Sequence, residues 1–225
     1  MLTPTQAETE ILNRMPSWPS EICPLLEAHG RTLRAAIHTD RDLPPFDRVT
    51  MDGYALRAAE LTDDRRSFRI QSVQAAGMRP TELSEAVGSC VEIMTGAVLP
   101  VGADCVVPYE ETTRDGDSMS LADGVSLEPG QSVHARGSDY AEGALVVEAG
   151  TRLTGREIAV AASCGCATLE VSRRPKIAVV STGDELVEVD AIVAPHQVRR
   201  SNDYAIRAAL IAAGFPEVSR FLLHD

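Results

Sequence analysis

Residues 89–112 read SCVEIMTGAVLPVGADCVVPYEET, and this stretch decides the class of fold. Short apolar runs alternate in it with Gly, Pro and Asp, a pattern typical of strands that are joined by tight turns. The same pattern extends over 68–109 and returns over 118–147, so we expect both segments to be rich in β-structure. The predicted fold class is α+β with several domains, of which the β-rich ones supply the middle of the chain.

Three segments before and after these strands carry helical patterns. Residues 4–15 place apolar side chains on one face and are followed by prolines. We expect a second short helix over 20–28 and a third over 153–165. In the third, Thr154 and Glu157 have the spacing of a capping box, which fixes where the helix begins.

The last fifty residues have a different character. The near-continuous apolar run KIAVVST at 176–182 predicts a strand that is buried on both faces. An Ala-rich helix is expected over 201–214 and a second strand over 218–225, which together make a parallel, right-handed βαβ unit. Two strands are few for such a sheet, so we expect only the truncated start of a three-layer α/β domain.

Composition excludes several classes of function. The chain has 225 residues, 44% of them hydrophobic, and a formal net charge of -12, which disfavours nucleic-acid binding. No signal peptide is evident at the N-terminus, and no apolar run approaches the ~20 residues of a membrane span. The five cysteines show no disulfide spacing, and Cys164 and Cys166 lack a second metal-binding pair. We therefore expect a reduced, cytoplasmic protein that binds neither nucleic acid nor a membrane.

Two short polar motifs stand out, one just before the β-rich segment and one within it. Asp52 precedes Gly53, whose backbone freedom would hold the carboxylate at a sharp, exposed bend. Thr95 and Gly96 follow an apolar strand, where open backbone N–H groups and a hydroxyl can face an anion. Each motif has a plain alternative, an Asp-Gly turn in the first case and a β-turn in the second.

A third group of polar residues stands at the carboxyl end of the strand at 176–182, where open parallel sheets bind their ligands. These residues are Ser181, Thr182, Gly183, Asp184 and Glu185. If Asp184 caps a following helix, the group is structural instead. Asp225 ends the next strand and can form a Mg²⁺ pair with Glu185. Asp139, in the loop RGSDY at 136–140, either caps that loop or faces a ligand.

Five motifs occur in a recognisable order. They are LPPFDRVTMDGYAL at 43–56, IMTGAVLPVGADCVVPYEE at 93–111, the segment that opens with RGSDY, KIAVVSTGDEL at 176–186, and QVRRSNDYAIRAALIAAG at 197–214. Taken together they resemble the molybdopterin molybdenumtransferases, the group that includes the gephyrin E domain of animals. The resemblance covers approximately 28–225.

The resemblance implies a reaction and a set of site residues. Members of this group insert molybdate into adenylylated molybdopterin with Mg²⁺ and release AMP. The implied catalytic residues are Asp52, Thr95 and Glu185. The implied cofactor-binding residues are Gly53, Gly96, Ser181, Thr182, Gly183 and Asp139. The implied metal ligands are Glu185 and Asp225.

The resemblance also implies an organisation. The domains would be N-terminal helices at 1–27, a β-rich linker domain at 28–47 and 133–170, an inserted β-rich domain at 48–132, and a truncated molybdopterin-binding α/β domain at 171–225. The group forms elongated homodimers, in which Asp52 and Thr95 of one subunit act with Glu185 of the other. Implied further partners are the molybdopterin adenylyltransferase and proteins of molybdoenzyme maturation.

The chain departs from the group in two respects. Arg199 and Arg200 stand where an acidic residue is usual, and the group continues well past residue 225. We therefore expect a chain that is inactive alone, although the full-length protein is an enzyme. The alternatives are a non-catalytic dimerisation or molybdopterin-binding fragment, a shortened paralogue, and an unrelated nucleotide-binding α/β protein. Molybdate and tungstate are not distinguished.

Overall fold

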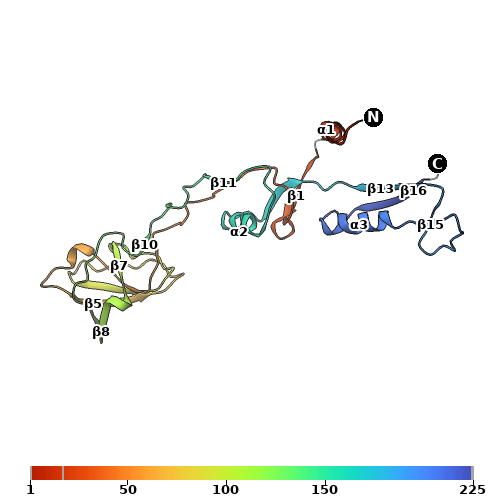
Figure 1. Ribbon diagram of the computed structural model, residues 1–225. Helices are drawn as coiled ribbons and strands as arrows, with labels where there is room; N and C mark the ends of the chain where they lie inside the picture. Colours follow the sequence, from red (N-terminus) through yellow and green to blue (C-terminus); the bar gives the residue numbers. More distant parts are fainter. Residues whose placement is uncertain (1, 17, 224–225) are drawn as a thin grey trace. The chain divides into compact units, whose positions relative to one another are not determined.

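The computed structural model describes residues 2–16 and 18–223 and divides into two compact units (Figure 1). The inserted unit is His38–Val146, and the flanking unit comprises Met1–Ile37 and Val147–Asp225. Each unit is described by itself below. The finer four-part division expected from the sequence stays a prediction, because a division into two compact units does not test it.

The inserted unit is built on a mixed sheet, as its β-rich sequence predicts. Within the described residues this sheet has six strands in the order β7-β4-β6-β5-β9-β8. Strands β5 and β6 pair in parallel, and the other neighbours pair antiparallel. The strands are β4 (Gly53–Leu56), β5 (Ser67–Gln74), β6 (Ser89–Ile93), β7 (Cys105–Pro108), β8 (Thr112–Asp115) and β9 (Ser118–Leu121). The remaining elements are β3 (Arg48–Val49), β10 (Val133–His134) and the 3-10 helices η2 (Ala58–Glu60) and η3 (Tyr109–Glu111).

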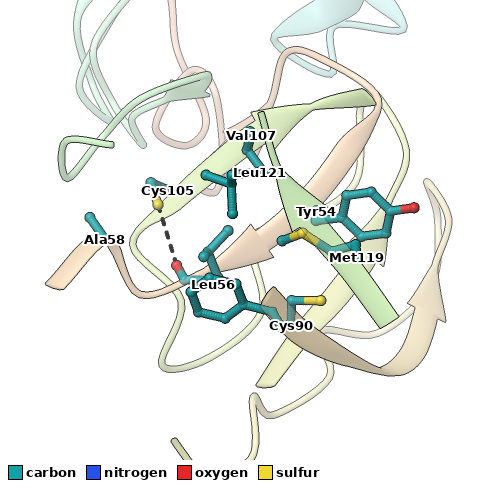
Figure 2. Packing of buried hydrophobic residues seen from close by; sticks show 9 residues of the cluster. Tyr54, Leu56, Ala58, Cys90, Cys105, Val107, Met119 and Leu121 are labelled. Atoms are coloured by element: carbon teal, nitrogen blue, oxygen red, sulfur yellow. Dashed lines mark hydrogen bonds between the residues drawn. The ribbon is translucent and has the colours of Figure 1, made fainter. Parts of the chain in front are cut away.

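A buried cluster fills one side of this sheet (Figure 2). Leu56, Phe68 and Met119 are almost fully buried in it. The Cys105 thiol points at Leu56 and lies 3.5 Å from its carbonyl oxygen. Burial raises the pKa of Cys90 and of Cys105 to about 12, so both thiols are neutral packing groups. All five cysteines are free thiols.

The flanking unit contains an antiparallel pair of strands, β1 (Ser20–Pro24) and β12 (Thr168–Ser172). Its other elements before residue 175 are α1 (Pro4–Arg14), η1 (Leu25–Glu27) and α2 (Gly155–Ser163). Two short strands, β2 (Ile37–His38) and β11 (Leu145–Val147), pair with each other. The expected helices over 4–15 and 153–165 are confirmed, each with a capping box, from Thr3 in α1 and from Thr154 in α2.

The prediction of a helix over 20–28 is wrong. Ser20–Pro24 is a strand, followed by a single 3-10 turn. The strand pairs with β12 over its whole length, and the buried Arg31 fixes the pairing by donating to the Ser172 carbonyl at 2.7 Å and to Glu21. These contacts come from residues far away in the sequence, so they override the local helical signal.

The end of the chain forms the expected βαβ unit. Strand β13 (Ile177–Thr182) pairs in parallel with β16 (Val218–Leu223), and α3 (Asn202–Ala212) connects them. Two short strands, β14 (Leu186–Val187) and β15 (Val198–Arg199), pair in parallel between β13 and α3. The expectation that β13 is buried on both faces is wrong for the described residues. Of its side chains only Val179 is buried, because β16 is the one strand beside it.

Candidate functional site

Asp52 and Thr95 form a close pair in the inserted unit. Asp52 is exposed at a bend immediately before β4, and Thr95 follows β6, which is the antiparallel neighbour of β4. The backbone N–H of Thr95 donates to Asp52 Oδ1 at 2.6 Å, and its hydroxyl donates to the same oxygen at 2.7 Å. These two bonds hold the pKa of Asp52 below its ordinary value, the backbone bond contributing most. The pair is therefore a fixed, ionised carboxylate at the surface.

Gly53 is needed here for a different reason from the one the sequence suggested. Its φ is not among the positive values of the chain, so the expected special backbone conformation is wrong. Instead, β7 passes so close that a Cβ on Gly53 would lie 1.9 Å from the Val107 carbonyl oxygen. Glycine lets β4 approach β7, and this approach sets the position of Asp52.

Gly96 does adopt a positive φ, of 85°, but its surroundings do not leave N–H groups open. The Gly96 N–H donates to the Val49 carbonyl at 2.8 Å, and the Ala97 N–H donates to the Met94 carbonyl at 3.1 Å. With the Thr95 N–H bonded to Asp52, the three successive donors are all used. The expected anion-binding backbone is therefore wrong, and a ligand-binding role of Gly96 stays a prediction.

Asp139 belongs to a chain of side chains that starts at Arg48. Arg48 Nη2 lies 3.1 Å from His134 Nδ1, and His134 Nε2 lies 3.0 Å from Asp139 Oδ1. A guanidinium can only donate, so Nδ1 accepts and Nε2 carries the proton that is donated to the carboxylate. Sequence reasoning missed Arg48 and His134, because they are 86 residues apart and meet only through the pairing of β3 with β10.

The same strand, β3, connects this hydrogen-bonded row of side chains to the Asp52–Thr95 pair. Val49 in β3 pairs with Val133 in β10 and accepts the Gly96 N–H with its carbonyl. The inserted unit therefore carries five of the residues singled out from the sequence: Asp52, Gly53, Thr95, Gly96 and Asp139. The first four lie together, and Asp139 is linked to them through His134 and β3.

The flanking unit carries the other predicted site residues. Ser181 and Thr182 end β13, and Gly183 turns the chain with a φ of 139°. The Glu185 carboxylate lies over Gly183, where a Cβ would be 2.6 Å from Oε2, so glycine makes room for this acid. The segment after Asp184 forms β14 rather than a helix, so the alternative in which Asp184 caps a helix is wrong.

A cavity of about 500 Å³ opens beside the end of β13. Ser181 and Thr182 line it together with the first residues of α3. Arg200 Nε donates to the buried Asp203 at 2.9 Å, and Arg220 Nη1 donates to the same carboxylate oxygen at 3.0 Å. The hydrogen bond from Arg200 is the main reason why the pKa of Asp203 lies below its ordinary value.

This ion cluster gives Arg200 a structural role that sequence reasoning missed. Arg200 also donates to Glu188 at 2.8 Å, whereas Arg199 donates to the Ala191 carbonyl at 3.2 Å. The spacing of three residues between Arg200 and Asp203, at the start of a predicted helix, was the available signal. The cluster ties the start of α3 to β16 through Arg220 and to the segment after β14 through Glu188.

Metal binding finds limited support. Across residues 2–16 and 18–223, no three His, Cys, Asp or Glu side chains are grouped as a metal site. Asp225 lies outside the described residues, so its pairing with Glu185 stays a prediction. Mg²⁺ commonly takes one or two carboxylates and completes its shell with water and substrate phosphates, and the exposed Glu185 suits such a site.

No helix among the described residues is both long enough and apolar enough to span a bilayer.

Comparison with known proteins gives a consistent result. Residues 2–165 match the protein family described as MoeA N-terminal region (domain I and II). The molybdopterin molybdenumtransferase of Synechocystis sp. is 39% identical over 198 residues, which cover 88% of this chain and 50% of that protein. The protein of the same name from Haemophilus influenzae is 33% identical over 211 residues, covering 93% and 52%.

Solved structures agree. The crystal structure of the molybdopterin biosynthesis moea protein from Pyrococcus horikosii aligns with a TM-score of 0.81 and 30% identity, covering 100% of this chain and 58% of that one. The chain spans about half the length of the curated relatives it matches.

Proposed function

The chain belongs to the family described as MoeA N-terminal region (domain I and II), and on that premise we propose that it serves molybdate insertion into adenylylated molybdopterin. The reaction transfers molybdenum to the dithiolene and releases AMP. The single observation that carries the proposal is the Asp52–Thr95 pair, bonded at 2.6 and 2.7 Å on an exposed bend. A surface carboxylate held in this way is suited to a ligand rather than to the core.

Asp52 has one oxygen free for chemistry. Both Thr95 donors go to Oδ1, and the structure shows no hydrogen bond to Oδ2 within the described residues. The low pKa keeps the group ionised at neutral pH. Oδ2 would accept a hydrogen bond or a proton from a substrate oxygen, while Thr95 fixes the direction of the carboxylate.

The flanking unit would supply the molybdopterin side of the site. Ser181 and Thr182 line the cavity and present hydroxyl groups to a phosphate or a pterin amide. Glu185 would hold Mg²⁺ together with water and phosphate oxygens. The bound cation would neutralise the phosphate link that is cleaved.

We further propose that the acting form is a homodimer. The resemblance implies a site shared between Asp52 of one subunit and Glu185 of the other. In one chain the two residues belong to different compact units.

The test measures AMP release from adenylylated molybdopterin with molybdate and Mg²⁺. Because the 225-residue chain is expected to be inactive alone, the full-length protein that contains it is used in three forms: wild type, Asp52→Asn and Asp123→Asn. Asp123 is an exposed acid of the inserted unit and serves as the matched control. We expect Asp52→Asn to lower the rate by about 100-fold, the usual effect of removing an acid–base group, and Asp123→Asn to leave it unchanged.

Equal rates for wild type and Asp52→Asn would remove Asp52 from the mechanism. Molybdopterin binding is measured in parallel by isothermal titration. Binding without AMP release in wild type would replace the enzymatic proposal with that of a binding module. This second candidate is favoured by the coverage of only about half of the relatives' length.

A further inference from the structure

The backbone of Asp52 is held as well as its carboxylate, by one hydrogen bond. Tyr109, which follows β7, donates its N–H to the Asp52 carbonyl oxygen at 3.2 Å. Asp52 is therefore gripped at two points, with Thr95 on its side chain and Tyr109 on its main chain. A movement of Tyr109 would act through this hydrogen bond on the bend that orients the Asp52 carboxylate.

Tyr109 is itself fixed by its side chain. Its hydroxyl donates to Glu92 Oε1 at 2.8 Å, and its ring meets the buried Tyr54 edge-on, at 5.3 Å between centroids and 80° between planes. Its carbonyl accepts the Thr112 hydroxyl at 3.0 Å. Burial and the neighbouring Glu92 raise the pKa of Tyr109, so the phenol keeps the proton that it donates.

Glu92 is a largely covered carboxylate with both oxygens in use. Its side chain is 12% exposed, and Arg114 Nη1 donates to Oε2 at 2.8 Å while Tyr109 occupies Oε1. A carboxylate in such a position needs these donors to offset its lost hydration. The arrangement is therefore a built feature and not a passing surface contact.

Glu92 and Thr95 both derive from the same strand, since Glu92 lies in β6 and Thr95 stands just beyond its end. We propose that Glu92 and Tyr109 are positioning residues for Asp52. Strand β6 and the residues just after it then hold both the side chain and the main chain of Asp52. Thr95 holds the carboxylate directly, and Glu92 holds the main chain through Tyr109. The catalytic meaning of this link rests on the proposed function, but the link itself does not.

The proposal predicts that cutting the link disturbs the Asp52–Thr95 bonds without touching either residue. Tyr109→Phe removes the hydroxyl bond to Glu92, and Glu92→Ala removes its acceptor. In both variants we expect the bend at Asp52 to rotate and the two hydrogen bonds from Thr95 to Asp52 to lengthen. Glu92→Gln should disturb the bend less than Glu92→Ala does, because its amide oxygen still accepts the Tyr109 hydroxyl, although its NH₂ group cannot accept from Arg114.

The experiment uses NMR on the full chain and needs no turnover. The ¹³C carboxyl shift of Asp52 is titrated with pH, and the Thr95 amide shift is recorded. Thr95→Val defines the full effect of losing the hydroxyl bond. We expect Tyr109→Phe and Glu92→Ala to raise the Asp52 pKa by at least half of that amount, and Glu92→Gln to raise it by less than Glu92→Ala does.

Tyr140→Phe is the matched control, since Tyr140 is an exposed tyrosine of the inserted unit whose hydroxyl makes no hydrogen bond shown within the described residues. It should leave both signals unchanged. If Tyr109→Phe and Glu92→Ala also leave them unchanged while Thr95→Val shifts them, the link is structural only and the proposal fails. Because both signals are independent of AMP release, a full-length protein that releases no AMP would overturn the proposed function and not this inference.

Discussion

At the scale of single residues, Gly53 has the tightest surroundings near the Asp52 pair. A methyl group at this position would overlap the Val107 carbonyl oxygen, which is backbone and cannot swing away. We expect Gly53→Ala to force β4 and β7 apart and to destabilise the inserted unit by about 3 kcal/mol, as overpacking does elsewhere. Denaturant unfolding followed by circular dichroism measures the change.

Gly155 provides the control. It opens α2, its φ is not positive, and a Cβ there meets nothing within 4 Å. Gly155→Ala should therefore be neutral or stabilise by about 0.5–1 kcal/mol. Equal stability of Gly53→Ala and wild type would show that the two strands can separate without cost.

At this scale the sequence singled out residues that the structure brings together, but not always for the reasons that the structure shows. The local pattern singled out Asp52 and Thr95 separately, and the pairing of β4 with β6 brought them together. It also singled out Gly53 and Gly96. The crowding at Gly53 comes from β7, and the Gly96 N–H is used by β3, so neither fact is contained in the neighbouring residues.

At the scale of elements, the α2 capping box gives a pH-dependent stability. The Thr154 hydroxyl and backbone N–H both donate to Glu157, together with Arg156, and lower the Glu157 pKa from 4.5 to about 2. A carboxylate whose folded pKa is depressed stabilises the fold above its unfolded pKa. This contribution is lost as the pH falls from about 4.5 through about 2.

Glu157→Gln tests this, because glutamine keeps the shape but not the charge. We expect wild type to melt at a higher temperature than the variant at pH 7, and the difference to shrink as the pH falls between about 4.5 and 2. Thermal unfolding followed by circular dichroism at several pH values is the measurement. A difference that stays constant across this range would contradict the assigned role of the Glu157 charge.

Elements with local signals were predictable, and those set by distant partners were not. Helix α2 was predicted because Thr154 and Glu157 mark its start within four residues. The segment Ser20–Pro24 carries equally plausible helical signals, yet β12 recruits it as a strand. The exposure of β13 was also missed. An apolar run indicates that a strand gains stability when it is buried, but it does not show which elements are present to bury it.

At the scale of the molecule, the inserted unit has what an independent domain needs. His38–Val146 is continuous in sequence and holds two buried clusters, one around Tyr54 and Leu56 and one around Val49 and Ile93. We expect this fragment to fold alone and to unfold cooperatively in denaturant. Circular dichroism and amide NMR dispersion would show it, and a disordered spectrum would contradict it.

The β-rich middle and the βαβ end were both predictable, since each rests on patterns of a few neighbouring residues. The strand pairing that joins the two pieces of the flanking unit, β1 with β12, was not predictable, and a discontinuous domain was expected only from the resemblance and with other boundaries. Nothing in Ser20–Pro24 marks Thr168–Ser172 as its partner.

The pairing of β1 with β12 has a consequence for biosynthesis. Arg31, which secures β1, and its acceptor Ser172 stand 141 residues apart, so β1 leaves the ribosome long before its partner strand is translated. The inserted unit can fold completely in the interval. During that time β1 is an unpaired strand edge on the nascent chain, which is the kind of surface that chaperones cover and that aggregates when left bare. The speed of translation across the inserted unit thus sets how long this edge stays open.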